Sequence, residues 1–139
     1  DSATTKWDIG FRGTTIITNS GTSGPGAGGA FVQIGVFADI AAVSNDSTFK
    51  TDAAPNYAIT TGSNKGWYVY DGPNNLVTPI PGRVLMIRTA TGKYAKLEIS
   101  NYYKGGVTPA VTASDNIKLT EQRYFTFRYT YQANGSKSF

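Results

Sequence analysis

The residues best suited to bind a ligand are three aromatic side chains that fall within four positions, Trp67, Tyr68 and Tyr70. On a β-strand successive side chains point to opposite faces, so the two tyrosines are expected on one face and Trp67 on the other. Such a cluster can stack on a flat ligand, for example a sugar, a haem or an aromatic metabolite. In the alternative interpretation Trp67 belongs to the core, and the two tyrosines cover a sheet edge or a loop.

The stretch GTSGPGAGGA, Gly21–Ala30, raises the question of a phosphate-binding loop. A P-loop ends in Lys followed by Ser or Thr and opens a helix, whereas this loop continues with Phe31 into residues typical of a strand. The dinucleotide-binding fingerprint also fails, because it requires a helix within a βαβ unit. The glycines therefore predict a turn with positive φ angles or close backbone approach, and an anion-binding nest of amides is the alternative.

The chain contains no histidine and no cysteine. This composition excludes zinc sites built on those residues, Ser-His-Asp triads and Cys-His dyads. Glu98 alternates with Lys96 and is expected to form a surface pair. Asp8 lies in the first predicted strand and is expected to accept hydrogen bonds from backbone amides. The sequence therefore predicts a protein that is not an enzyme.

The charged and apolar residues are both dispersed along the chain. The formal net charge is +4, and the basic residues are scattered from Lys6 to Lys137 without a cluster. A nucleic-acid interface needs a concentrated basic patch, so we expect no nucleic-acid partner. Apolar runs such as Val84–Ile87 are far shorter than the ~18 residues of a membrane-spanning helix, so no transmembrane segment is expected.

Alternation of apolar and polar residues, rather than helical periodicity, dominates the chain. Phe125, Phe127, Tyr129 and Tyr131 occupy alternate positions and are therefore expected on one face of a strand. The predicted strands are Lys6–Arg12, Thr14–Thr18, Ala30–Phe37, Tyr57–Thr61, Trp67–Tyr70, Arg83–Thr89, Lys93–Ser100 and Tyr124–Tyr131.

Turn and loop signals separate these strands. Ala90–Gly92 predicts a tight hairpin turn. Three prolines and two asparagines make Asp71–Pro81 a loop with an extended piece at Leu76–Val77, and Tyr102–Asn116 is a second long loop. The sequence therefore predicts a single all-β domain over residues 1–139, with mostly antiparallel sheets and long loops rich in glycine and proline.

Five segments of the chain occur in an order that points to a known family. They are KWDIGFRGTTIITNSGTSGPGAGGA at residues 6–30, GWY at 66–68, RVLMIRTATGKYAKLEI at 83–99, NYYKG at 101–105 and FTFRYTYQANGS at 125–136. Together they resemble the HmuY-like haem-binding protein family. The resemblance implies an all-β lipoprotein exported to the outer-membrane surface, which hands haem to a TonB-dependent outer-membrane transporter and catalyses no reaction. It also implies that the glycine loop is a structural feature of the family.

The sequence departs from the family pattern at the iron ligands, because the founding haem binder uses two histidines and this chain has none. Asp71 occupies the place of one of them, just before a Gly-Pro pair, and the segment that carries the other is shorter here. The single methionine, Met86, lies in an apolar run and is expected in the core. Tyrosinate ligation by Tyr70 or Tyr68 would favour ferric iron.

The resemblance also concerns the start of the chain. Six residues precede Trp7, whereas members of the family carry an upstream strand and a lipidated cysteine. We therefore expect an upstream N-terminal strand and a lipid-anchor segment to lie outside this chain.

These observations predict an exported, non-enzymatic surface binding protein that captures a ligand of the haem or iron class beside a TonB-dependent transporter. The expected ligand-binding residues are Trp67, Tyr68, Tyr70 and Asp71, and the metal-ligand candidates are Tyr70 and Met86, with haem as the candidate cofactor. One alternative is an accessory surface subunit that binds a protein partner and no haem. Another is a carbohydrate-binding module that uses the same aromatic residues.

Overall fold

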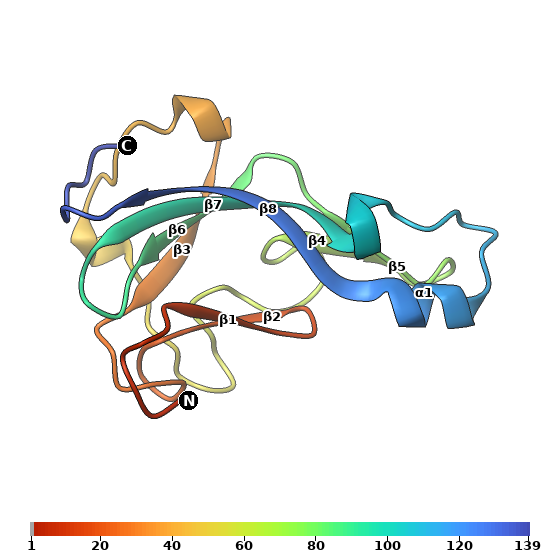
Figure 1. Ribbon diagram of the computed structural model, residues 1–139, viewed down its shortest axis with the longest axis horizontal. Helices are drawn as coiled ribbons and strands as arrows, with labels where there is room; N and C mark the ends of the chain where they lie inside the picture. Colours follow the sequence, from red (N-terminus) through yellow and green to blue (C-terminus); the bar gives the residue numbers. More distant parts are fainter. Residues whose placement is uncertain (1) are drawn as a thin grey trace.

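An antiparallel sheet of four strands forms the centre of the computed structural model, which describes residues 2–139 (Figure 1). Two of its strands, β6 (Arg83–Arg88) and β7 (Tyr94–Tyr103), pair across a short turn, for example Leu85 with Leu97, so the predicted hairpin is confirmed. The last strand of the chain, β8 (Gln122–Gln132), lies at one edge of the sheet next to β7. In spatial order the strands are β3 (Gly29–Ile34), β6 (Arg83–Arg88), β7 (Tyr94–Tyr103) and β8 (Gln122–Gln132).

Two further hairpins accompany the sheet. The first, β1 (Ile9–Arg12) with β2 (Thr15–Thr18), lies below the sheet in Figure 1. The second, β4 (Tyr68–Asp71) with β5 (Leu76–Pro79), lies near helix α1 (Asp115–Glu121), away from both chain termini. All these strand pairings are antiparallel, so the predicted all-β class with antiparallel sheets is confirmed. Short 3-10 turns are η1 (Phe37–Asp39), η2 (Asp46–Thr48) and η3 (Lys104–Gly106).

Strand β6 is buried on both faces, which explains its continuous apolar run. Val84 and Met86 point into one core cluster, which the η1 and η2 segments cover from outside. Leu85 and Ile87 point into a second, larger cluster that also contains Trp67. Met86 is fully buried, so its expected place in the core is confirmed.

The glycine loop folds around the buried side chain of Asn19. The Asn19 amide nitrogen donates to the Trp7 carbonyl at 2.8 Å, and its Oδ1 accepts from the Gly26 amide at 2.9 Å. The Gly28 amide donates to the Asn19 carbonyl at 3.0 Å, and a Cβ atom at Gly28 would lie 2.7 Å from that oxygen. Because these amides are bonded within the protein, the loop is a close-packed turn rather than an anion-binding nest.

Two local predictions are corrected by the structure. Tyr57–Thr61 is not a strand, because the Ala58 amide donates to Asp52 Oδ1 at 2.9 Å instead of to a neighbouring strand. Helix α1 was not predicted and begins within the predicted loop Tyr102–Asn116, where the Ser114 hydroxyl accepts from the Ile117 amide at 3.3 Å to cap it. No helix within residues 2–139 has the length and apolar character needed to cross a bilayer.

Candidate ligand-binding site

Trp67 and Tyr68, two of the four expected ligand-binding residues, belong to the core. Trp67 is 2% exposed, its Nε1 donates to the Thr14 carbonyl at 2.9 Å, and its ring packs 4.9 Å from that of Tyr68. Strand β4 begins at Tyr68, so Trp67 lies before the strand and the expected alternation of side chains between its faces does not apply to it. The interpretation of Trp67 as a core residue is confirmed, whereas Tyr68 is buried rather than covering an edge or loop.

Tyr70 and Asp71, the other two, hold the turn of the β4–β5 hairpin. The Tyr70 hydroxyl donates to Asn75 Oδ1 at 2.9 Å, and the Asp71 carboxylate accepts from the Asn74 side-chain amide at 2.7 Å. Tyr70 also lines a cavity of about 260 Å³ beside Lys118 of α1. The structure therefore does not gather the four residues into one exposed wall, and their role in ligand binding stays a prediction.

The two metal-ligand candidates lie in different places. Met86 is enclosed in the core cluster that contains Val84 and Tyr94, whereas Tyr70 lies on the surface of the β4–β5 hairpin. Within residues 2–139, no three His, Cys, Asp or Glu side chains lie close enough together to hold a metal ion. Coordination of one ion by both Tyr70 and Met86 has no support in this arrangement.

The expected surface pair of Lys96 and Glu98 does not form. Lys96 is 5% exposed, and its Nζ donates to the carbonyls of Phe37 at 2.6 Å and Ile40 at 2.9 Å. The side chain points into the core cluster beneath η1, where these carbonyls satisfy the buried ammonium group. Glu98 instead pairs with Arg128 on the neighbouring strand at 2.6 Å.

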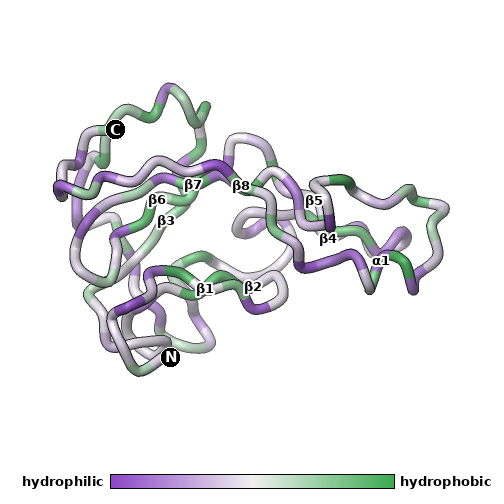
Figure 2. The backbone as a smooth tube through the Cα atoms, in the orientation of Figure 1, coloured by the Kyte–Doolittle hydropathy of each residue, from purple (hydrophilic) through white to green (hydrophobic). Residues whose placement is uncertain are grey.

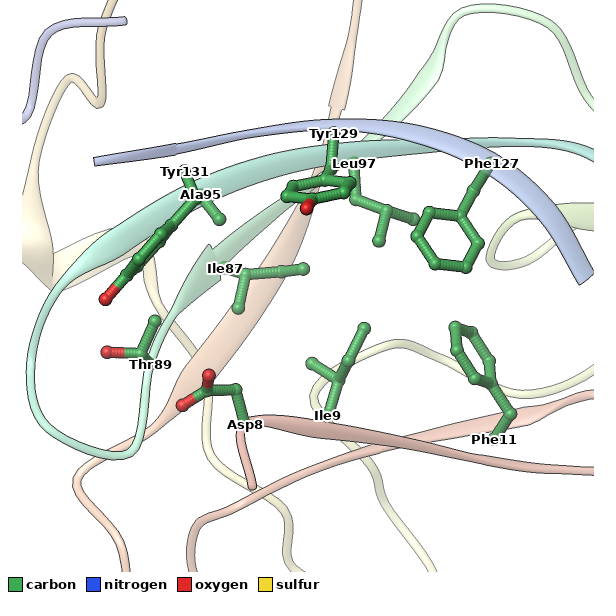
Figure 3. A pocket seen from close by; sticks show the side chains of 10 residues that line it. All are labelled: Asp8, Ile9, Phe11, Ile87, Thr89, Ala95, Leu97, Phe127, Tyr129 and Tyr131. Atoms are coloured by element: carbon green, nitrogen blue, oxygen red, sulfur yellow. The ribbon is translucent and has the colours of Figure 1, made fainter. Parts of the chain in front are cut away.

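A groove of about 470 Å³ lies between the β1–β2 hairpin and the sheet, and we call it the aromatic groove (Figure 3). Its aromatic wall consists of Phe127, Tyr129 and Tyr131, which are 39%, 64% and 45% exposed. These residues alternate along β8 and project from the same face, as predicted for them and for Phe125. The pattern thus brings three large rings to one open surface.

The other sides of the aromatic groove are apolar. Ile9 and Phe11 of β1 face the sheet, while Ile87 and Leu97 form the floor (Figure 3). The Phe11 ring stacks on that of Phe125 with a centroid distance of 4.2 Å, and this contact closes one end of the groove. At the other end Asp8 and the β6–β7 turn approach each other, because the Ala90 amide donates to Asp8 Oδ1.

Four polar side chains line the aromatic groove, and two are already engaged. Asp8 Oδ1 accepts from the Ala90 amide at 2.9 Å, which confirms the expected role of this carboxylate as an acceptor for backbone amides. Thr89 Oγ1 accepts from a backbone amide at 2.8 Å. Within residues 2–139, the hydroxyls of Tyr129 and Tyr131 have no hydrogen-bond partner, so these phenols remain free to contact a ligand.

The groove was not expected as a site, although one sequence signal belongs to it. Phe125, Phe127, Tyr129 and Tyr131 place four aromatic rings on one face of an edge strand, and the last three of these rings stay exposed. Such an exposed cluster indicates a functional surface. The facing wall comes from β1, at the other end of the chain, and no local pattern reveals that approach.

Comparison with known proteins identifies a family. A model of the HmuY protein family matches residues 1–114. The match contains β1 to β7 and ends before α1 and β8, so the floor and hairpin wall of the aromatic groove lie within it and the aromatic wall lies outside. No curated protein matches the chain.

Proposed function

This chain belongs to the HmuY family, and we propose that it is an exported, non-enzymatic surface protein that captures a ligand of the haem and iron class. We further propose that it acts beside a TonB-dependent outer-membrane transporter, with its lipid anchor outside this chain. Family membership supports a haem-binding surface protein, and the absence of histidine and cysteine leaves out the commonest catalytic groups.

The observation that carries this proposal is the aromatic groove. Its volume of about 470 Å³ lies within the range of small-molecule sites, ~300–1,000 Å³. A floor of Ile87 and Leu97 and a wall of three aromatic rings suit a flat apolar molecule that enters edge-on between the two layers. The site around Tyr70 and Asp71 exposes less aromatic surface to a ligand, because the neighbouring Trp67 and Tyr68 are buried.

The groove offers phenol oxygens as the candidate ligands for haem iron. No histidine, methionine, lysine or arginine is among the residues that line it, so imidazole and thioether ligation have no source there. The phenol oxygens of Tyr129 and Tyr131 are free, and tyrosinate is an established ligand of haem iron. We therefore expect aromatic stacking to hold the porphyrin and an oxygen atom, rather than a nitrogen or sulfur, to meet the iron.

Haemin titration tests the proposal. The purified chain, Phe127→Ala and Tyr70→Phe are each titrated with haemin while the Soret band is followed. We expect a saturable shift that Phe127→Ala weakens by about tenfold or more in Kd, because a stacking ring is lost, while Tyr70→Phe binds as the parent does. A parent spectrum that stays that of free haemin removes haem as the ligand, and loss of binding in Tyr70→Phe alone returns the site to the β4–β5 hairpin.

A second candidate function is that of an accessory subunit that binds a protein partner and no haem. It is favoured by β8, an eleven-residue strand at the sheet edge that exposes Tyr124 and Tyr129. Long apolar edge strands readily pair with another strand. Co-purification of a colourless protein with an outer-membrane transporter, lost on Tyr124→Lys but kept on Phe127→Ala, supports this function over haem capture.

A further inference from the structure

The two free phenols of the aromatic groove differ in their surroundings. In Figure 3 the Tyr129 hydroxyl lies in the middle of the wall, between the side chains of Tyr131 and Phe127. The Tyr131 hydroxyl lies at one end of the groove, on the side of Thr89 and Asp8. A flat ligand that fills the groove therefore presents its centre to Tyr129 and its rim to Tyr131.

Geometry also distinguishes the same two phenols. A phenol binds iron as the phenolate, so its proton must leave, and its oxygen must reach the metal at the centre of the porphyrin. The Tyr131 hydroxyl lies beside the side chains of Thr89 and Asp8 at one end of the groove, whereas the Tyr129 hydroxyl lies between its neighbours on the strand. Alternate residues of one strand are also ~6.8 Å apart, so only one of the two oxygens can lie over a single iron atom.

We infer that the phenolate of Tyr129 is the iron ligand of the aromatic groove and that the groove therefore selects ferric over ferrous porphyrin. This inference rests on the proposed function. On binding, the Tyr129 hydroxyl releases its proton to solvent, and its oxygen displaces a water molecule from the ferric ion without any change in oxidation state. Phenolate oxygen is a hard, anionic donor that stabilises the ferric state, so reduction weakens the bond.

Two matched variants and three probes test the inference. Tyr129→Phe and Tyr131→Phe each remove one hydroxyl. These two variants and the parent chain are titrated with haemin, with dithionite-reduced haem and with iron-free protoporphyrin IX. Haemin and reduced haem are followed by the Soret band and by phenolate-to-iron charge transfer in resonance Raman spectra. Protoporphyrin IX is followed by quenching of tryptophan fluorescence, which reports porphyrin binding without an iron bond.

We expect the parent to bind haemin with phenolate Raman bands and to bind reduced haem at least about tenfold more weakly. Tyr129→Phe should lose these bands and bind haemin at least about tenfold more weakly, with an unchanged Kd for protoporphyrin IX. Tyr131→Phe should keep both the bands and the affinity. The unchanged affinity for protoporphyrin IX separates loss of the ligand from loss of folding.

Three results overturn the inference. Haemin binding with phenolate bands retained in Tyr129→Phe excludes this residue and leaves the proposed function standing. Loss of the bands in Tyr131→Phe alone assigns the ligand to Tyr131 instead. Binding of neither haemin nor protoporphyrin IX by the parent chain removes the proposed function and the inference together.

Discussion

Three side chains attach the C-terminal tail to the body of the protein. The Tyr94 hydroxyl donates to Asp46 Oδ1, and Lys137 Nζ lies 2.9 Å from Asp46 Oδ2. The hydrogen bond from Tyr94, followed by the one from Lys137, lowers the pKa of Asp46 from its usual 3.8. The same bond to Asp46, followed by burial, raises the pKa of Tyr94 from its usual 10.0.

These shifts predict that the tail, which backbone hydrogen bonds also hold, is released more often at acidic and at strongly alkaline pH. A lowered pKa of Asp46 stabilises the fold above pH 3.8, and this contribution is lost as the pH falls through the folded-state value. A raised pKa of Tyr94 stabilises the fold below pH 10.0, and its contribution is lost as the pH rises through the folded-state value. Hydrogen exchange of the Val43 amide, which donates to the Lys137 carbonyl at 2.8 Å, measures the release.

The matched control is Asp46→Asn, which removes the titrating carboxylate and keeps the shape of the side chain. Its Val43 amide should exchange faster than in the parent at neutral pH, and the ratio of open to closed tail should no longer change as the pH falls below 3.8. After correction for intrinsic exchange, an equal acid dependence in both proteins contradicts the assignment to Asp46.

At the scale of elements, the glycine loop depends on close contact between backbones. A Cβ atom at Gly28 would lie 2.7 Å from the Asn19 carbonyl oxygen, and neither backbone can move without breaking the bonds of the loop. We expect Gly28→Ala to lower the free energy of unfolding by about 1–3 kcal/mol, as measured in urea. At Gly35 a Cβ atom meets its nearest neighbour, Ile40 Cδ1, at 3.7 Å, so Gly35→Ala is the control and should change stability little. Equal losses in both variants contradict the steric explanation.

Elements with local signals were predictable, and elements that depend on distant contacts were not. The β6–β7 hairpin follows from the apolar run of β6, the alternation along β7 and the short glycine turn between them. Tyr57–Thr61 has the composition of a strand, but its Ala58 amide donates to the Asp52 carboxylate, which also accepts a hydrogen bond from the distant Thr18 amide of β2. Helix α1 has seven residues, too few for a periodic pattern, and its Ser114 cap is a weak signal alone.

The candidate site was predictable only in part. The side-chain alternation that correctly placed Phe127 and Tyr129 on one face of β8 also placed Trp67 and Tyr68 on opposite faces of a strand. It fails for the second pair, because covering layers bury both side chains where β4 begins. Burial is set by what packs on a strand from elsewhere in the chain, so a periodic pattern identifies faces but not which face stays open.

At the scale of the whole molecule, the aromatic groove lies between two layers, the β1–β2 hairpin and the sheet. Figure 2 shows apolar segments on β1 and β2 and on β3 and β6, the elements that face the core. The Phe11 ring joins the layers by stacking on Phe125 at 4.2 Å and by lying 5.9 Å from Phe127. The position of the β1–β2 hairpin over the sheet, and hence the width of the groove, therefore depends on this aromatic contact.

We expect Phe11→Ala to affect stability and ligand binding together. The ring is 36% exposed, so its loss should lower the free energy of unfolding by about 1–2 kcal/mol, part of the ~1.5–3 kcal/mol of full burial. A widened groove loses contact with a flat ligand, and the Kd for haemin should rise by about three- to tenfold, as the loss of one aromatic contact predicts. Urea unfolding and haemin titration of the same preparation measure the two effects.

Ile34→Ala provides the comparison, because Ile34 is 79% exposed on β3 at the opposite edge of the sheet from β8. It should leave both the free energy of unfolding and the Kd for haemin near the parent values. If Phe11→Ala loses stability but keeps its affinity for haemin, the contact between the layers is purely structural and the ligand binds elsewhere. If Phe11→Ala remains folded but its Kd for haemin rises, the hairpin must form one wall of the site. A lower free energy of unfolding alone does not change the Kd of a chain that remains folded.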